Sequence, residues 1–174
     1  MLKKSLEPSG IIFFTDCKEN ISLALDEIRD LSHRVAPVFF GGSTTEETFR
    51  RLFNAFNMDE KSEFLLHVDQ AVNNYALSVE MQLNLYRILQ EQLRNIQKYA
   101  NASFIEVDVL IYNHKLKMKI SDNGVGFNVN KVKGGIGLAN MKRKAELFSG
   151  KFEIYSSPGN GCEIIIDMPL PEIK

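Results

Sequence analysis

The feature that most constrains the fold is a β-hairpin pattern in the second half of the chain. Residues 104–112 and 116–121 are rich in apolar and β-branched side chains, and Asn113-His114-Lys115 between them has the composition of a turn. Two strands joined so closely pair antiparallel. The pattern therefore predicts an antiparallel sheet as the organising element of the fold.

Further strands and helices are predicted on both sides of this hairpin. A short strand is expected at 64–68, and a second hairpin is expected at 151–156 and 162–168, around Pro158-Gly159-Asn160-Gly161. Together with the helical patterns, these strands predict an α+β fold, a two-layer sandwich whose mixed, mostly antiparallel sheet has helices on one face. Helices are predicted at about 43–57, where 43–47 offers a capping box, at 79–99 and at 138–148.

The first 42 residues are expected to form a separate N-terminal segment, with a second domain at 43–174. Ile21, Ile28 and Val35 are seven residues apart in a helical pattern that ends before Pro37. A stripe this short is typical of an amphipathic packing helix, although a remnant of a coiled coil remains an alternative. Gly41-Gly42 is expected to form a hinge or a turn.

Charge and composition exclude several classes of function. The chain has 21 Lys and Arg against 22 Asp and Glu, so it lacks the basic excess of a broad nucleic-acid surface. It has no apolar stretch long enough to cross a bilayer, so we expect a cytoplasmic piece whose parent protein could be membrane-anchored. Cys17 and Cys162 lie far apart without ligand spacing, which argues against a disulfide framework or a zinc site.

Two familiar nucleotide-binding motifs fail on this sequence. The phosphate-binding GxxxxGK[ST] loop is missing. Gly135-Ile136-Gly137-Leu138-Ala139-Asn140 approaches a dinucleotide fingerprint, but its last position departs and the preceding residues 130–133 are too polar for the required strand. A Rossmann fold is therefore not predicted.

A set of polar residues recurs at helical spacing in the long predicted helix. Arg87, Glu91, Asn95 and Lys98 follow one another at intervals of four, four and three, which places them on one face. Taken alone, this pattern is more typical of a solvated helix face than of a site. The opposite, core-facing side is apolar and comprises Leu85, Ile88, Leu89, Leu93 and Ile96.

Two glycine-containing segments favour a site over a solvated face. In Asp122-Asn123-Gly124-Val125-Gly126-Phe127, a carboxylate at a strand end precedes two glycines that allow close backbone approach to a ligand. The alternative for this segment is a hairpin turn. Gly134-Gly135-Ile136-Gly137 runs directly into a helix, whose N-terminal amides and positive dipole end suit phosphate groups.

These segments, taken in order, resemble the sequence boxes of sensor histidine kinases. The order and spacing are most similar to the subfamily paired with helix-turn-helix response regulators, and the resemblance covers about residues 20–171. It implies the Bergerat ATP-binding fold of the GHKL superfamily. The matching segments are 85–95 with 98–100 (N-box), 122–127 (first glycine box), 135–141 with Arg143 (second glycine box), and a final hairpin with Gly161 and Pro169-Leu170-Pro171.

The resemblance implies ATP and Mg²⁺ as ligands and assigns roles to individual residues. Asp122 would accept a hydrogen bond from the adenine amino group, Asn95 would give an oxygen to Mg²⁺, and Glu91 would be catalytic, orienting or activating the acceptor nucleophile. Residues 128–133 would form a lid over the nucleotide. The implied ATP-binding residues are Asn95, Lys98, Tyr99, Asp122, Gly124, Gly126, Phe127, Gly135, Ile136, Gly137 and Leu138.

The sequence departs from the family at two positions and lacks a convincing phosphoacceptor. Tyr99 stands where the family usually has His, and Cys162 where it usually has Thr. His33 is followed by Arg34 instead of an acidic residue, and it precedes Asn95 by only 95 − 33 = 62 positions. Residues 24–37 better resemble the second helix of a dimerisation hairpin. The acceptor histidine is therefore expected outside this chain.

The resemblance implies a two-component sensor kinase as the parent protein. Its partners would be the phosphoacceptor-histidine helix of the same protein and a response regulator, in a homodimer that does not bind nucleic acid. The chain alone would bind ATP without phosphorylating itself. Two alternatives share the fold: a partner-binding relative that has lost nucleotide function, which Tyr99 and Cys162 would suit, and an anti-sigma-factor-type serine kinase.

Overall fold

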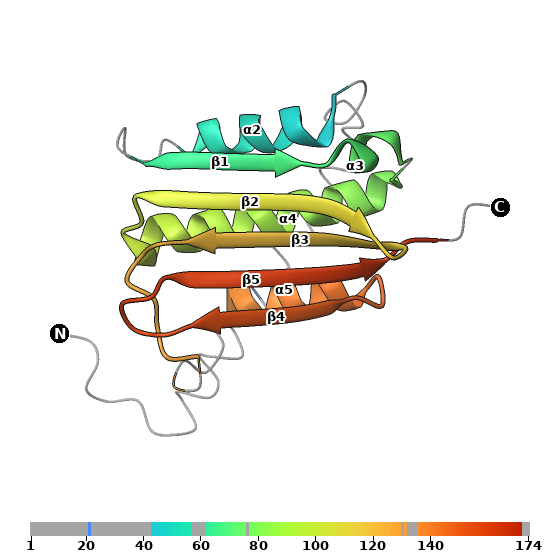
Figure 1. The fold of residues 1–174 in the computed structure, drawn as a ribbon. Helices are drawn as coiled ribbons and strands as arrows, with labels where there is room; N and C mark the ends of the chain where they lie inside the picture. The colour runs from blue at the N-terminus through green and yellow to red at the C-terminus, as the bar shows by residue number, and fades with distance from the viewer. Residues whose placement is uncertain are drawn as a thin grey trace. The chain divides into compact units, whose positions relative to one another are not determined.

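The computed structural model describes Ile21 and residues 43–56, 62–75, 77–129, 131 and 136–171. These residues contain a five-stranded sheet with the strand order β1-β2-β3-β5-β4, shown in Figure 1. β1 (Glu63–Val68) pairs parallel with β2 (Phe104–Tyr112), and the other neighbouring strands pair antiparallel. The predicted mixed, mostly antiparallel sheet is therefore confirmed. The remaining strands are β3 (Lys115–Asp122), β4 (Lys151–Ser156) and β5 (Cys162–Pro169).

The central hairpin turns more tightly than the sequence predicts. Asn113 and His114 form the turn with φ values of 48° and 56°. Positive φ at both central positions is typical of a type I′ turn, whose twist matches that of the flanking strands. Lys115, which the sequence places in the turn, instead begins β3 opposite Tyr112.

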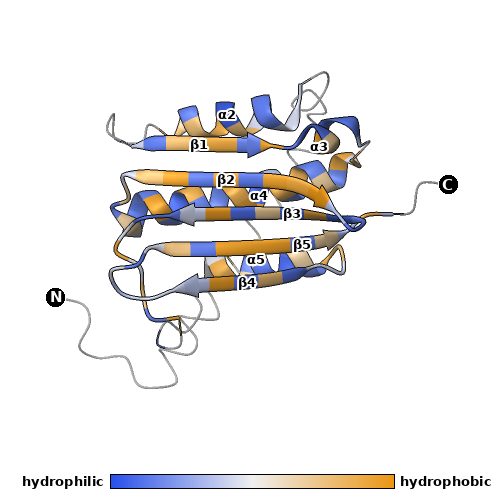
Figure 2. Ribbon diagram, viewed as in Figure 1, coloured by the Kyte–Doolittle hydropathy of each residue, from blue (hydrophilic) through white to orange (hydrophobic). Residues whose placement is uncertain are grey.

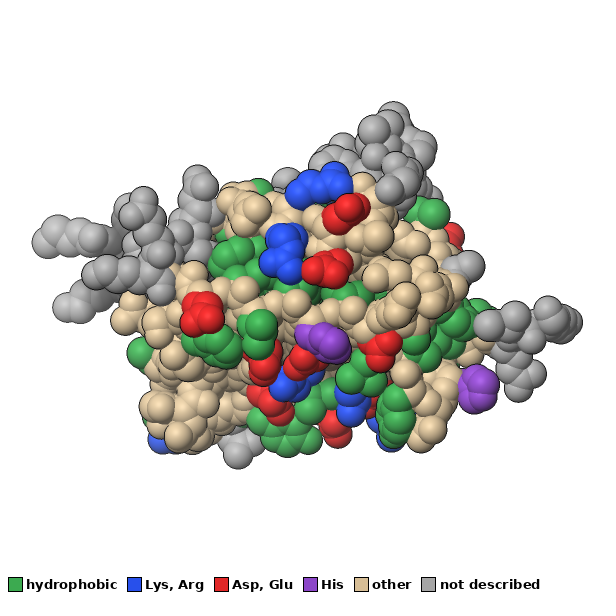
Figure 3. Space-filling view, turned by 45° about the horizontal axis from the view of Figure 1, so that its top comes forward, with side chains coloured by type: hydrophobic (Ala, Val, Ile, Leu, Met, Phe, Trp, Pro, Cys, Tyr) green, Lys and Arg blue, Asp and Glu red, His purple; other side chains and the backbone are tan. Residues whose placement is uncertain are grey.

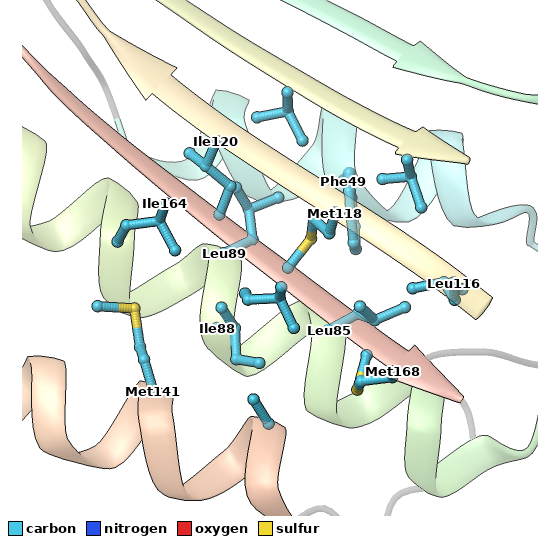
Figure 4. Packing of buried hydrophobic residues seen from close by; sticks show 14 of the residues in the cluster. Phe49, Leu85, Ile88, Leu89, Leu116, Met118, Ile120, Met141, Ile164 and Met168 are labelled. Atoms are coloured by element: carbon cyan, nitrogen blue, oxygen red, sulfur yellow. The ribbon is translucent and has the colours of Figure 1, made fainter. Parts of the chain in front are cut away.

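Helices cover one face of the sheet and bury the core against it. α2 (Thr45–Ala55), α4 (Val79–Asn95) and α5 (Ile136–Glu146) lie on the same side (Figure 1). Apolar and polar residues alternate along the strands in Figure 2, so each strand sends one apolar set towards these helices. Figure 4 shows Leu85, Ile88 and Leu89 of α4 packing among the strand side chains. All three are fully buried, as their apolar spacing predicts.

Local signals fix where α2 and α4 begin. Thr44 and Glu47 form the predicted capping box, in which each side chain bonds the backbone amide of the other residue. The Ser78 side chain accepts a hydrogen bond from the Met81 amide and caps α4. These caps satisfy backbone amides that the first turn of each helix would otherwise leave unpaired.

Two helical features were not predicted. The short helix α3 (Gln70–Asn74) follows β1 and is capped by Asp69. The last turn of the long helix is a π-helix, η2 (Ile96–Ala100), which ends at Asn101 with a φ of 49°. A π-helical turn is wider than an α-helical one, so it rotates the residues that follow away from the face on which α-helical spacing would place them.

The other face of the sheet carries charge pairs between neighbouring strands. Lys119 Nζ lies 3.1 Å from both Glu106 Oε2 and Asp108 Oδ2, and Lys117 Nζ lies 3.8 Å from Asp167 Oδ1. Hydrogen bonds to Asp108 and Glu106 raise the pKa of Lys119. Figure 3 shows acidic, basic and apolar side chains interspersed on this side of the molecule. The core and the ion-paired face are thus separated by the sheet.

Some expectations lie outside the described residues. Apart from Ile21, which is helical, the predicted N-terminal segment 1–42 and His33 within it are not described. His67 and His114 are described, and both are exposed. Among the described residues, no helix is long and apolar enough to cross a membrane.

Candidate functional site

The centre of the candidate site is a buried carboxylate at the end of β3. Asp122 is only 8% exposed. Its Oδ1 accepts a hydrogen bond of 2.9 Å from the Gly124 amide, while its Oδ2 is buried without a hydrogen-bond partner. Burial raises the pKa of Asp122, and the backbone amides of Gly124 and Cys162 oppose that rise. Because a buried acceptor without a donor is costly, Oδ2 is well suited to receive one from a ligand.

The loop after Asp122 is fastened to two other parts of the chain. The Val125 amide donates to the Ala100 carbonyl at 2.8 Å, and the Gly124 carbonyl accepts from the Gly161 amide at 2.9 Å. The Phe127 amide donates to Ser156 Oγ at 2.9 Å. These bonds tie the loop to η2 and to the β4–β5 hairpin, so the position of Asp122 is set by the surrounding backbone.

Both glycines of this loop are required by its geometry. A Cβ on Gly124 would overlap the carbonyl oxygen of Ala100. Gly126 has a φ of +60°, and a Cβ there would overlap the carbonyl oxygen of Ser157. Asp-x-Gly-x-Gly is therefore a close-packed loop that presents a carboxylate, and the hairpin-turn alternative for 122–127 is wrong.

Asn123 is a structural residue that sequence reasoning did not single out. Its Oδ1 accepts from the amides of Ser103 and Phe104, at 2.9 Å each, and its Nδ2 donates to Ser103 Oγ at 3.0 Å. Three bonds to the start of β2 make Asn123 the anchor of the loop. An Asn directly after a strand-end carboxylate was the available signal.

The end of α4 and the following π-turn supply the polar residues that the helical spacing predicted. Glu91 and Asn95 are half-buried, whereas Lys98 and Tyr99 are exposed, Tyr99 to 71%. Arg87, on the same predicted face, is buried. This face is therefore not uniformly solvated, so the alternative of a purely solvent-exposed helix face does not hold for all four residues.

The first turn of α5 packs against Glu91. A Cβ added to Gly137 would lie 2.5 Å from Glu91 Oε1, so the glycine is what allows this close approach. The other oxygen, Oε2, accepts a hydrogen bond from Arg94 Nη1 at 3.1 Å. Glu91 is thus held between its own helix and the N-terminal end of α5.

A buried Gln lies between the two halves of the site. Gln92 is 3% exposed, and its Nε2 lies 4.0 Å from Cys162 Sγ. Burial raises the pKa of the Cys162 thiol to about 12, with a further contribution from the nearby charge of Asp122. Cys162 therefore remains a neutral thiol under ordinary conditions and packs as a small apolar residue. Gln92 was not predicted as functional, although a polar residue within the apolar stripe of α4 was a usable signal.

These contacts bring the predicted segments together around the end of α4. Glu91 meets α5, Gln92 reaches β5 next to Asp122, and Ala100 meets the loop at Gly124. Phe127 and Leu138 are partly buried against the core instead of standing free. Gly135, the Ile136 side chain and much of the predicted lid 128–133 lie outside the described residues.

The match to a family of known proteins covers most of this arrangement. Residues 80–172 match the family described as histidine kinase-, DNA gyrase B- and HSP90-like ATPases. The matched range contains all of α4 but its first residue, Asp122 with its loop, α5 and the β4–β5 hairpin. The chain belongs to this ATPase family.

Two curated relatives of this ATPase-family chain are sensor histidine kinases. The sensor histidine kinase LiaS of Bacillus subtilis (strain 168) is 31% identical over 153 residues, which are 87% of this chain and 41% of the relative. The oxygen sensor histidine kinase NreB of Staphylococcus carnosus (strain TM300) is 30% identical over 156 residues, again 87% of this chain and 44% of the relative. The chain thus spans less than half the length of these relatives.

A solved structure supports the fold of this ATPase-family domain. The histidine kinase domain of the blue-light activated histidine kinase from Erythrobacter litoralis EL346 superposes with a TM-score of 0.62 at 17% identity. The similarity covers 73% of this chain and 61% of the other. At this identity the likeness establishes the fold, and it confirms the predicted α+β class.

Proposed function

We propose that the chain is the ATP-binding catalytic domain of a two-component sensor histidine kinase. In this proposal it binds ATP with Mg²⁺ and donates the γ-phosphate to a histidine, from which the phosphate passes to a response regulator. Membership of the ATPase family and the two sensor-kinase relatives support this assignment.

One observation carries the nucleotide part of the proposal, namely the unpartnered Oδ2 of Asp122. This oxygen could accept a hydrogen bond from the amino group of a purine. The bond would be charge-assisted, because the acceptor is a carboxylate. Gly124 packs against the Ala100 carbonyl and Gly126 against the Ser157 carbonyl, so the loop backbone beside this oxygen is held in place. These features support our proposal that an adenine binds at this end of the site, called the base end below.

The metal and phosphates would be held by few protein groups. No cluster of three or more His, Cys, Asp or Glu side chains in the described part of the chain could form a metal cage. Asn95 instead turns its Nδ2 towards Gln92 Oε1, at 3.5 Å, which leaves Oδ1 for a cation. This suits Mg²⁺, which takes one or two protein oxygens and keeps waters and phosphate oxygens, and which when bound would neutralise phosphate charge. Lys98 and the N-terminal amides of α5, with Gly135, Ile136, Gly137 and Leu138, would meet the phosphates.

Phosphoryl transfer needs positioning and charge stabilisation more than covalent chemistry from the protein. Glu91, held by Arg94 and facing α5, would orient or deprotonate the incoming acceptor. Tyr99 and Phe127 would lie beside the base and sugar. Residues 128–133 would close over the bound nucleotide.

The acceptor and the partners are placed outside this chain. We propose that the acceptor histidine lies on a helix elsewhere in the same protein, that residues 1–42 carry a remnant of its dimerisation hairpin, and that 43–174 form the catalytic domain. The full-length protein would act as a homodimer, phosphorylate its own acceptor helix and pass the phosphate to a response regulator. Because ATP is the donor, this domain would work in the cytoplasm.

Titration of the chain with an ATP analogue and Mg²⁺ tests the proposal. We expect saturable binding, and Asp122→Asn should weaken it by about tenfold to a hundredfold because a charge-assisted bond to the base is lost. Asp167→Asn is the matched control, since Asp167 pairs with Lys117 on the opposite face of the sheet, and it should change affinity by less than about twofold.

Two outcomes would contradict the proposal. Equal binding by wild type and Asp122→Asn would remove the base-recognition role of Asp122. No binding by the wild-type chain would favour a partner-binding relative that has lost nucleotide function.

A further inference from the structure

Gln92 is a polar residue at a buried position of α4 that otherwise carries apolar side chains. Leu85, Ile88 and Leu89 share its face of α4 and are buried in the core. Burying an amide is costly unless it is hydrogen-bonded. The partners of Gln92 are a thiol, which is a weak acceptor, and the amide of Asn95. These contacts recover little stability, so its place in the core points to a role in the site.

The two contacts of Gln92 determine how its amide group is turned. Nε2 faces Cys162 Sγ at 4.0 Å, and Cys162 is paired across the sheet with Asp122. Oε1 therefore faces α4's next turn, where Asn95 Nδ2 donates to it at 3.5 Å. An Asn whose nitrogen is engaged in this way presents its oxygen on the other side.

We propose that Gln92 is a positioning residue that orients the Asn95 amide so that Oδ1 faces a nucleotide-bound cation. The sulfur of Cys162 anchors Gln92 in the orientation that this requires. The chain Cys162–Gln92–Asn95 thereby connects the strand pair that carries the base-binding carboxylate to the proposed metal ligand. This inference rests on the proposed nucleotide function and deepens it.

The test compares ATP binding with Mg²⁺ and with excess EDTA, using the full chain and isothermal titration calorimetry. Gln92→Met keeps the length of the side chain and removes both polar contacts. We expect it to lower the affinity measured with Mg²⁺ by about tenfold, and to leave the affinity measured with EDTA within about twofold, because loss of a ligand-orienting partner weakens metal binding. A merely structural role would weaken both affinities equally.

Gln97→Met is the matched control. Gln97 lies five residues further on in η2 and donates from Nε2 to the Phe56 carbonyl, away from Asn95 and Cys162. The same substitution there should leave both affinities, and hence their ratio, unchanged. A changed ratio in Gln97→Met would mean that any Gln-to-Met substitution in this region alters Mg²⁺-dependent binding, and that the effect is not specific to Gln92.

A second pair of variants keeps the proposal testable if Gln92→Met does not fold. Cys162→Ser retains an acceptor for Gln92 and should keep the Mg²⁺-dependent gain in affinity, whereas Cys162→Ala removes the acceptor and should reduce that gain several-fold. An equal gain in Ser and Ala variants, or an unchanged gain in Gln92→Met, would overturn the inference and leave the proposed function standing. Failure of the wild-type chain to bind ATP at all would instead defeat the proposed function.

Discussion

The two ends of the candidate site are held in different ways. At the base end, the loop after Asp122 is fixed by backbone hydrogen bonds to η2 and to the β4–β5 hairpin. At the other end, the first turn of α5 rests on a side chain, because Gly137 lies against the carboxylate of Glu91. A backbone obstacle cannot move aside, whereas the end of a Glu side chain can rotate. The base end should therefore tolerate change poorly and the phosphate end should adapt.

The largest effect is expected from Gly124→Ala. Its Cβ would overlap the Ala100 carbonyl, so the loop must shift, which should lower the free energy of unfolding by about 1–3 kcal/mol. Nucleotide binding should be lost with it. Chemical denaturation of both proteins, with ATP titration of the variant, measures these effects.

Adding Ala100→Gly to this variant sharpens the prediction. The second exchange removes the Ala100 methyl group and leaves the carbonyl oxygen in place, so it should not restore stability. Restored stability in the double variant would show that a side chain, and not the backbone, limits the base end.

Gly137→Ala should have a smaller and more selective effect. The nearest atoms to its Cβ would all belong to the Glu91 side chain, which can rotate away, and Ala favours a helix over Gly, so stability should change by less than about 1 kcal/mol. Displacing Glu91 should lower affinity for ATP by roughly threefold to tenfold. Adenosine, which lacks phosphates, should bind as to wild type, and parallel titrations with both ligands measure the difference. Equal losses for ATP and adenosine would break the distinction between the two ends.

The smallest effect is expected from pH at the base end. The pKa of Asp122 is raised by burial, so its contribution to stability is greatest below the unfolded-state pKa and is lost as pH rises through the folded-state pKa. A base amino group favours the charged carboxylate, so affinity for adenosine should change in the opposite sense and fall as the pH is lowered towards the folded-state pKa. Titrations carried downwards from neutral pH should show this fall in the wild type, beginning at a higher pH than an unperturbed carboxylate would give. The Asp122→Asn variant, which cannot titrate at this position, should show a flat profile.

The sequence predicts the parts of this molecule that depend on periodic burial. The apolar stripe containing Leu85 and Leu89 predicts α4, and the carboxylate before two glycines predicts the base end. The role of Gln92 could not be predicted from the sequence, because its contacts with Cys162 and Asn95 depend on tertiary packing that residue spacing does not specify.

Local geometry accounts for the remaining differences. The π-turn at Ile96–Ala100 retains the apolar and polar pattern of an α-helix, so the pattern cannot reveal it. α3 is only five residues long, too short for helical periodicity to register. Lys115 joins β3 because positive φ at Asn113 and His114 completes the turn in two residues.

The fastening of the Asp122 loop by the β4–β5 hairpin has a consequence for the order of folding. The Gly161 and Gly159 amides that hold the Gly124 and Val125 carbonyls come more than 30 residues later in the chain. During synthesis Asp122 leaves the ribosome well before these amides. The growing chain therefore contains the carboxylate before the hydrogen bonds that fix its loop can form. The chain should therefore become able to bind a ligand only late in synthesis, when the β4–β5 hairpin forms.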